Sequence, residues 1–206
     1  MIENKSVIDF GCGAGHQAIG IAKNGAAKVI GLEIQDHLLA EAKRNADESG
    51  LSERCVFQKS TDAKADIIIS KDAFEHFEKP DEILEIMSSM LNPEGYVLAA
   101  FGPTWLHPYG GHLFSVFPWS HLLFTEKAQI RWRSDFKNDG ATRFSEVAGG
   151  LNQITISKFE KIVDQSPFFI DWMETVPIKG IALFKTKLFR EIGSSIVRCK
   201  LRLKNA

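Results

Sequence analysis

The feature that most constrains the fold is a short apolar segment that runs directly into a glycine-rich turn. Residues Ser6–Phe10 carry the apolar segment, and the turn that follows reads Gly-Cys-Gly-Ala-Gly over positions 11–15. Glycine adopts a left-handed backbone at little cost and lacks a Cβ atom, so the chain can turn sharply and a ligand can lie against it. Residues 14–23 have a helical pattern, so the turn joins a strand to a helix N-terminus. Unpaired N–H groups and the helix dipole attract oxygen-rich or anionic groups there, which predicts a nucleotide-type site.

Strand-like and helix-like patterns alternate through the first half of the chain. Near-continuous apolar strands separated by amphipathic helices are typical of a parallel sheet covered on both faces. Such a doubly wound α/β sheet binds its ligands at the carboxyl ends of the strands, where the strand order reverses. We expect strands at Ser6–Phe10, Lys28–Leu32, Cys55–Phe57, Asp66–Ser70 and Tyr96–Phe101, and helices over residues 14–23, 36–49 and 81–91.

The second half of the chain has a different composition. Residues 103–150 are rich in Trp, Phe, His, Pro and Gly, and they follow a strand that ends on the ligand side of the sheet. We therefore expect one domain over residues 1–206, with 103–150 as an inserted cap of short helices and loops over the substrate. The cap aromatics Trp105, Phe114, Phe117 and Trp119 are expected to form a small core. Regular elements return as a helix over 155–164, a strand over 168–176, a short helix over 181–191 and a last strand over 195–204.

Composition excludes several classes of partner. The chain has 25 Lys and Arg against 26 Asp and Glu, so its net charge is −1. It lacks the basic excess that would indicate a nucleic-acid partner. The cysteines at positions 12, 55 and 199 lack metal-binding spacing, so we expect reduced thiols and no metal site. We find no signal peptide and no run of about 18 apolar residues, so the sequence predicts a soluble, cytoplasmic protein.

The glycine spacing leaves two ligand classes open. The position that would complete the dinucleotide fingerprint is His16 rather than glycine, and no Lys-Ser/Thr pair follows as in a triphosphate-binding loop. Glu33 ends the second expected strand, where a carboxylate accepts hydrogen bonds from both hydroxyls of an adenosine ribose. Because Glu33 alone also fits NAD, a nicotinamide-dependent oxidoreductase stays an alternative at this point.

Several motifs together resemble the class I S-adenosylmethionine-dependent methyltransferases, in particular their type 11 branch. They are the segment Asp9–Gly15, the acid Glu33, and the segments Ser60–Ala63, Asp66–Phe77 and Met90–Tyr96. The resemblance covers residues 6–101 and is only architectural beyond residue 103. It implies a mostly parallel, seven-stranded Rossmann-like sheet whose last strand is antiparallel. It also implies S-adenosylmethionine (SAM) as cofactor, S-adenosylhomocysteine (SAH) as by-product, and a small or medium-sized acceptor methylated at O, N or C.

The resemblance also implies which residues contact the cofactor. Gly11 and Gly13 would pass beneath its methionine and ribose parts, and Asp9 would either orient the turn or approach the ammonium group. Ile34 would lie against one face of the adenine, and Ala63 would offer its N–H to the ring. Asp62 would accept from the adenine amino group, Lys71 would direct its backbone carbonyl at the cofactor, and His76 would close over the methionine side. The full expected set is Asp9, Phe10, Gly11, Cys12, Gly13, Glu33, Ile34, Thr61, Asp62, Ala63, Lys71 and His76.

His112 is the candidate catalytic residue, because it stands in a glycine-hinged segment directly after the fifth expected strand. An imidazole with an ordinary pKa near 6.5 suits deprotonation of a hydroxyl or amine at neutral pH. We expect structural roles for His107 and His121, and a surface or helix-capping role for Glu75. Family members carry a further segment before the first strand, so this chain is either a fragment or variant start, or residues 103–150 do all the covering. A non-catalytic SAM-binding protein remains a second alternative.

Overall fold

The computed structural model describes residues 2–114, 117–137, 140–147 and 150–204. Its sheet has seven strands in the order β3-β2-β1-β4-β5-β7-β6. The pairs β1–β2, β2–β3, β1–β4 and β4–β5 are parallel, whereas β7 runs antiparallel to both β5 and β6. This confirms the predicted fold class. The strands are β1 (Ser6–Phe10), β2 (Lys28–Leu32), β3 (Cys55–Gln58), β4 (Ala65–Lys71), β5 (Leu91–Phe101), β6 (Phe168–Pro177) and β7 (Ser194–Leu203).

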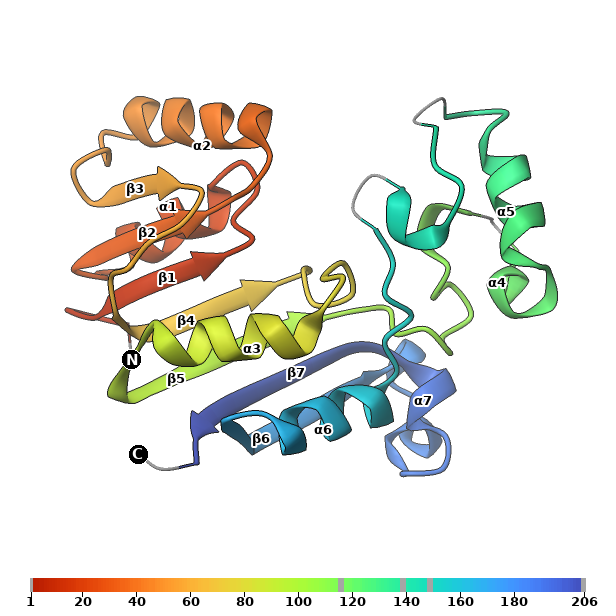
Figure 1. Cartoon of the computed structure of the whole chain (residues 1–206). Coiled ribbons are helices and arrows are strands. Elements are labelled where there is room, and N and C mark those ends of the chain that lie inside the picture. The colour runs from red at the N-terminus through yellow and green to blue at the C-terminus, as the bar shows by residue number, and fades with distance from the viewer. Residues whose placement is uncertain (1, 115–116, 138–139, 148–149, 205–206) are drawn as a thin grey trace.

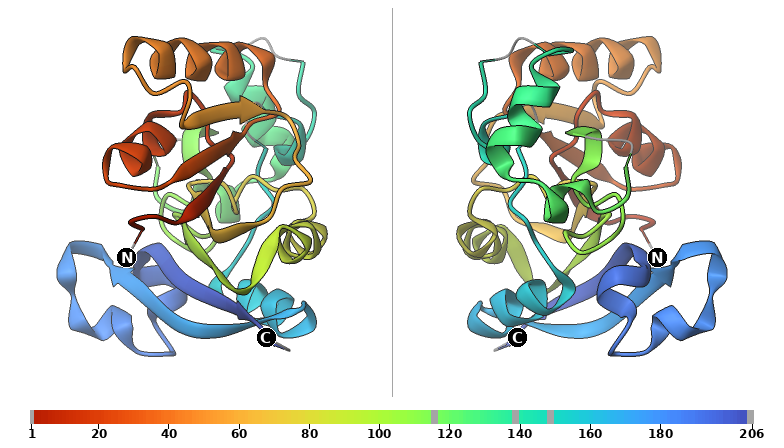
Figure 2. Two further views of the ribbon diagram at one scale, coloured as in Figure 1. Left: turned by 90° about the vertical axis from the view of Figure 1, so that its left-hand side faces the viewer. Right: turned by 90° about the vertical axis from the view of Figure 1, so that its right-hand side faces the viewer.

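Helices cover both faces of this sheet, as Figures 1 and 2 show. The helices α1 (His16–Lys23) and α2 (Asp36–Glu48) share one apolar core, and α3 (Pro80–Ser89) and α6 (Ile156–Gln165) share another. Neighbouring strand residues point to opposite faces, so Val7 packs in the first core and Ile8 in the second, both buried. Burial on both sides explains why the strands read as continuous apolar runs. No helix within the described ranges is long and apolar enough to cross a membrane.

Three fully buried phenylalanines join the sheet, the β4–α3 loop and α6. Phe74 lies in that loop, Phe101 ends β5, and Phe159 lies on α6. Their ring centroids are 5.7 Å apart for Phe74–Phe101, 5.5 Å for Phe74–Phe159 and 4.7 Å for Phe101–Phe159. These offset and edge contacts are favourable for aromatic rings. The cluster fixes the loop that carries Glu75 and His76 against the end of β5.

The predicted cap consists of short helices and loops beyond the carboxyl ends of the parallel strands (Figure 1). Its elements are η1 (His112–Phe114), α4 (Ser120–Leu123), α5 (Glu126–Arg133) and η2 (Phe144–Glu146). A separate apolar core holds it together, formed by Phe114, Phe144, Val147 and Leu151 with Trp105 packed against it. The other two aromatics expected in this core, Phe117 and Trp119, are exposed instead.

The expected helix over residues 181–191 is wrong. The range contains only the short helix η4 (Ala182–Lys185) and the start of α7 (Arg190–Gly193), and a further short helix, η3 (Ile178–Gly180), precedes it. The large apolar side chains of Ile181, Leu183 and Leu188 are exposed. Isolated helices of this length are marginal, and most helical stability comes from packing an apolar face. Without such packing, the helix-like pattern does not produce one continuous helix.

Candidate functional site

Two positions of the glycine turn, Gly13 and Gly15, favour glycine for different physical reasons. Gly13 and Gly15 have left-handed φ values of +52° and +80°. A Cβ atom on Gly15 would lie 2.8 Å from the Phe57 ring, so packing beneath the turn requires glycine there. A Cβ atom on Gly13 would meet nothing within 4 Å, so the backbone is open on that side. The turn therefore exposes bare backbone where the sequence predicts a ligand.

Glu33 ties this turn to the end of β2. Its side chain is buried, with 8% of the residue exposed. Oε2 accepts a hydrogen bond from Gly13 N at 3.0 Å, and Oε1 accepts one from Gln35 N at 2.9 Å. A carboxylate oxygen has two lone pairs, so each oxygen can still accept a bond from a hydroxyl group. The next residue, Ile34, is a large apolar residue that is 79% exposed.

Asp9 holds a second carboxylate at the end of β1. The residue is 2% exposed, and its Oδ1 accepts a hydrogen bond from Gln17 Nε2 at 3.1 Å. Within the described ranges, its Oδ2 is buried and has no hydrogen-bond partner. Burial raises the pKa of Asp9 to about 7, which outweighs the lowering by Gln17, the Ala18 backbone and Lys71. An unpartnered carboxylate oxygen in this position suits a cationic group of a ligand.

Glu75 and His76 lie in the loop between β4 and α3, and their placement departs from the expected surface role of Glu75. Glu75 is only 4% exposed, and its Oε1 accepts a bond from Gly102 N at 3.1 Å. Burial raises the pKa of the Glu75 carboxyl. His76 is exposed, and its Nδ1 lies 2.7 Å from the Gly150 carbonyl oxygen. Glu75 therefore belongs to the interior of the site.

Asn152, which sequence reasoning missed, holds this loop in place. Its Nδ2 donates to Phe74 O at 2.6 Å and to Phe77 O at 2.8 Å, and its Oδ1 accepts from Ile154 N at 3.0 Å. Its own N–H donates to Glu75 O at 3.1 Å. No local pattern in the sequence marks this residue, because its partners in the β4–α3 loop lie more than seventy positions away.

His112 lies at the start of the cap, facing the same loop. Its ring centroid is 5.5 Å from that of His76. Burial lowers its pKa to about 4, with further lowering from His76, His121 and His107. This corrects the expectation of an ordinary pKa near 6.5: His112 is neutral at pH 7 and a weaker proton acceptor than a free imidazole. His107 accepts from Tyr109 N and the His121 ring bonds Trp105 O, in line with the structural roles predicted for them.

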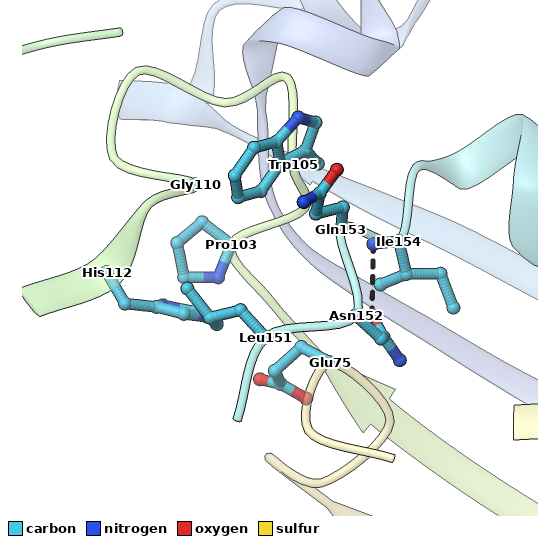
Figure 3. Close-up of a pocket in the computed structure, with 9 residues that line it drawn as sticks. All are labelled: Glu75, Pro103, Trp105, Gly110, His112, Leu151, Asn152, Gln153 and Ile154. Atoms are coloured by element: carbon cyan, nitrogen blue, oxygen red, sulfur yellow. Dashed lines mark hydrogen bonds between the residues drawn. The ribbon is translucent and has the colours of Figure 1, made fainter. Parts of the chain in front are cut away.

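A small pocket lies between this loop and the cap, as Figure 3 shows. It holds about 10 Å³ of space, close to what a single bound water or ion needs. The glycine turn is close by, because a Cβ atom on Gly11 would lie 3.2 Å from the Cβ of Ala73, two residues before Glu75. The pocket is lined by Glu75, Pro103, Trp105, Gly110, His112, Leu151, Asn152, Gln153 and Ile154.

Comparison with known proteins decides between the two ligand classes. A family model described as a methyltransferase domain matches residues 2–103. These residues belong to the class I S-adenosylmethionine-dependent methyltransferase family. The match contains the glycine turn, Glu33, and the loop with Glu75 and His76, so the family resemblance of the motifs is confirmed.

Individual relatives agree with the family match. Ribosomal protein L11 methyltransferase from Haemophilus influenzae is 32% identical over 98 residues, which cover 46% of this chain and 32% of that protein. The chain thus spans about a third of the length of this curated relative. Among solved structures, a SAM-dependent methyltransferase from Mesorhizobium loti has a TM-score of 0.66 at 16% identity, covering 98% of this chain and 92% of its own. Magnesium protoporphyrin IX methyltransferase from Synechocystis, solved with bound SAM, has a TM-score of 0.57 at 18% identity, covering 98% and 71%.

The other residues predicted to contact the cofactor lie in the β3–β4 connection and at the end of β4. Thr61, Asp62 and Ala63 follow β3, and Ala63 N donates to Thr61 Oγ1 at 3.1 Å. That N–H is therefore already used, and contact with adenine requires this bond to open. Lys71 ends β4 with its side chain exposed and its Nζ 3.3 Å from Asp72 Oδ2.

Phe10 and Cys12, also in the predicted set, flank Gly11. The Phe10 ring packs edge-on against Phe77 at a centroid distance of 5.8 Å. Cys12 is buried, and burial raises the pKa of its thiol to about 12, so it stays protonated at neutral pH. The Cys12 side chain is buried, whereas Phe10 is half-buried.

The raised pKa of Asp9 predicts a pH-dependent stability. Between pH 4 and 7 the folded protein binds more protons at Asp9 than the unfolded chain does, so wild-type stability falls as the pH rises through this range. Asp9→Asn removes this loss. We expect the stability of the variant relative to wild type to improve by about 2 kcal/mol between pH 5 and pH 8, measured by urea unfolding. An equal difference at both pH values would contradict the assignment.

Proposed function

We propose that this chain transfers a methyl group from SAM to a small or medium-sized acceptor at an O, N or C atom. The observation that carries the proposal is the buried Glu33 carboxylate, bonded to Gly13 N and Gln35 N at the end of β2. Its free lone pairs fit the two ribose hydroxyls, and it would repel a 2′-phosphate. Asp9 Oδ2, buried and without a partner in the part of the chain described, fits the ammonium group. The apolar surface of Ile34 fits one face of the adenine.

The protein's task in such a reaction is mainly positional. Bound SAM supplies a methyl carbon that its sulfonium already activates for displacement. The glycine turn, Glu33 and Asp9 would hold the cofactor at fixed points along this edge of the sheet. The cap then positions the acceptor in line and excludes water, and such orientation lowers the barrier by several kcal/mol. A proton must be removed only when the acceptor is a hydroxyl or an amine.

We infer the size and charge of the acceptor from the cap rather than from the substrates of the relatives. The chain covers only about a third of the L11 methyltransferase, so the protein substrate in that relative's name is not carried over. The pocket beside the cap is small, and its lining combines apolar side chains with the amides of Asn152 and Gln153, one carboxylate and one imidazole. The net charge is −1, so the chain has no overall basic excess of the kind that favours phosphate-rich acceptors. These features favour a small acceptor.

The test is a thermal-shift series with SAM, SAH and NADH in parallel, followed by an assay of SAH formation with candidate acceptors. A ligand at 100 times its dissociation constant stabilises the fold by about 2.7 kcal/mol. We expect stabilisation by SAM and SAH but not by NADH, and SAH formation with at least one acceptor. Stabilisation by NADH alone would favour the oxidoreductase alternative. Stabilisation by SAM without turnover of any acceptor would favour the non-catalytic SAM-binding alternative.

A further inference from the structure

Three side chains at the mouth of the cap form a group. His76 and His112 were predicted singly, as a cofactor contact and as the catalytic residue, and the methyl-transfer proposal does not account for their convergence with Glu75. Glu75, His76 and His112 each place one potential ligand atom so that all three atoms lie within 4.8 Å of one another. Glu75 and His76 come from the β4–α3 loop, whereas His112 comes from η1, so the fold brings together residues that are far apart in sequence. The cysteine pattern gave no reason to expect a metal site, and this group contains no cysteine.

Two polar atoms of these side chains are buried without a partner among the described residues. Glu75 Oε2 and His112 Nε2 are both buried and have no hydrogen-bond partner among the described residues. Leaving a buried polar atom unsatisfied costs on the order of 1–3 kcal/mol, and such atoms are rare in folded proteins. Glu75 is only 4% exposed. Its other carboxylate oxygen, Oε1, already accepts a hydrogen bond from Gly102 N. A ligand that both atoms can bind would remove this cost.

The third side chain, His76, is oriented so that one of its ring nitrogens can bind the same ligand. His76 Nδ1 lies 2.7 Å from the Gly150 carbonyl oxygen, and a carbonyl can only accept, so Nδ1 carries the hydrogen. In the neutral ring the lone pair is then on Nε2. Histidines that bind metals almost always donate their other ring N–H to a carbonyl or carboxylate in this way. The Gly150 carbonyl therefore acts as the orienting partner that such a site requires.

We propose that Glu75, His76 and His112 bind one divalent transition-metal ion, best fitted by Zn²⁺, between the glycine turn and the cap. Two imidazoles and one carboxylate are a ligand set of catalytic zinc sites and of non-haem iron sites, whereas Mg²⁺ and Ca²⁺ prefer oxygen ligands. Tetrahedral zinc needs ligand atoms roughly 3.4 Å apart. The three atoms lie within 4.8 Å of one another, so a bound ion would draw them closer together, and His76 is the exposed member of the group.

The geometry also indicates what the ion would do. Three protein ligands leave a fourth position open, and Glu75 and His112 both line the pocket beside Pro103 and Trp105. We expect a hydroxyl oxygen of the methyl acceptor to bind the ion at this position. A metal ion beside a hydroxyl favours its ionised form, and the released proton passes to solvent. This role rests on the proposed methyl transfer, whereas metal binding itself does not.

Metal titration of the untagged full chain tests the proposal. After chelator treatment we expect one Zn²⁺ per chain by calorimetry, and visible absorption bands typical of tetrahedral coordination when Co²⁺ is added. His112→Ala and the isosteric Glu75→Gln should each weaken Zn²⁺ binding at least about 100-fold. His37→Ala, which removes an exposed histidine on α2, is the matched control and should leave affinity unchanged.

The outcomes separate this proposal from the proposed function. SAM affinity, measured in the same samples, should be unchanged in Glu75→Gln, which also shows that the variant is folded. Absence of stoichiometric Zn²⁺ binding by the wild-type chain overturns the metal site, as does unchanged binding in both ligand variants. If Zn²⁺ binds as expected but SAM does not, the metal site stands and the methyl-transfer proposal fails.

Discussion

Glu33→Gln is expected to weaken SAM and SAH binding by about 100-fold, because it removes the charge that accepts several hydrogen bonds at once. Glu33 Oε2 accepts from Gly13 N and Oε1 from Gln35 N, and we propose that the ribose hydroxyls donate to the same oxygens. A glutamine amide can offer only one acceptor oxygen, so one of these N–H groups would face an NH₂ donor. Calorimetric titration with SAH measures the loss.

A matched control separates binding from folding in this experiment. Glu48→Gln makes the same chemical change at an exposed position at the end of α2 and should leave affinity unchanged. Because Glu33 also holds the glycine turn, the unfolding midpoint of each variant is measured alongside. Equal SAH affinity in Glu33→Gln and wild type would remove Glu33 from the cofactor site.

Phe159→Ala is expected to destabilise the fold by about 3–5 kcal/mol, the largest effect on stability that we predict for a single substitution. The side chain is fully buried, and its ring contacts both Phe74 and Phe101 at centroid distances of 5.5 and 4.7 Å. Its removal leaves a cavity beneath the loop that carries Glu75 and His76. Urea unfolding at constant pH measures the change.

Phe169→Ala provides the control for this substitution. Phe169 lies on the edge strand β6 and is 43% exposed, so its truncation removes fewer buried contacts. We expect a loss below about 1.5 kcal/mol, since surface changes cost far less than core ones. Similar losses in the two variants would mean that the Phe74–Phe101–Phe159 cluster does not organise the core as described.

The sheet could be predicted from sequence because its signals are local. Ser6–Phe10 and Lys28–Leu32 are apolar runs with glycine or acid at their ends, and both strands form with the predicted bounds. The position of Glu33 beside the glycine turn was likewise predictable, since it depends on the spacing between the turn and the end of the next strand. The prediction of a helix over residues 181–191 was wrong, because tertiary packing rather than the helix-like sequence pattern decides the structure there.

The acceptor side could not be predicted in the same way. Glu75 follows a strand and looks like an ordinary surface acid, but Gly102 and Asn152 close over it from distant parts of the chain. The pKa of His112 is set by burial in a cap whose packing no periodicity reveals. The convergence of Glu75, His76 and His112 is a property of the folded chain alone.

The most direct test of the account is a crystal structure of the chain soaked with SAH. We predict density for the adenosyl group along the glycine turn, with both ribose hydroxyls within hydrogen-bonding distance of Glu33 and the amino group facing Asp9. A crystal in which SAH occupies a different surface, or leaves this sheet edge empty at saturating concentration, would contradict the account.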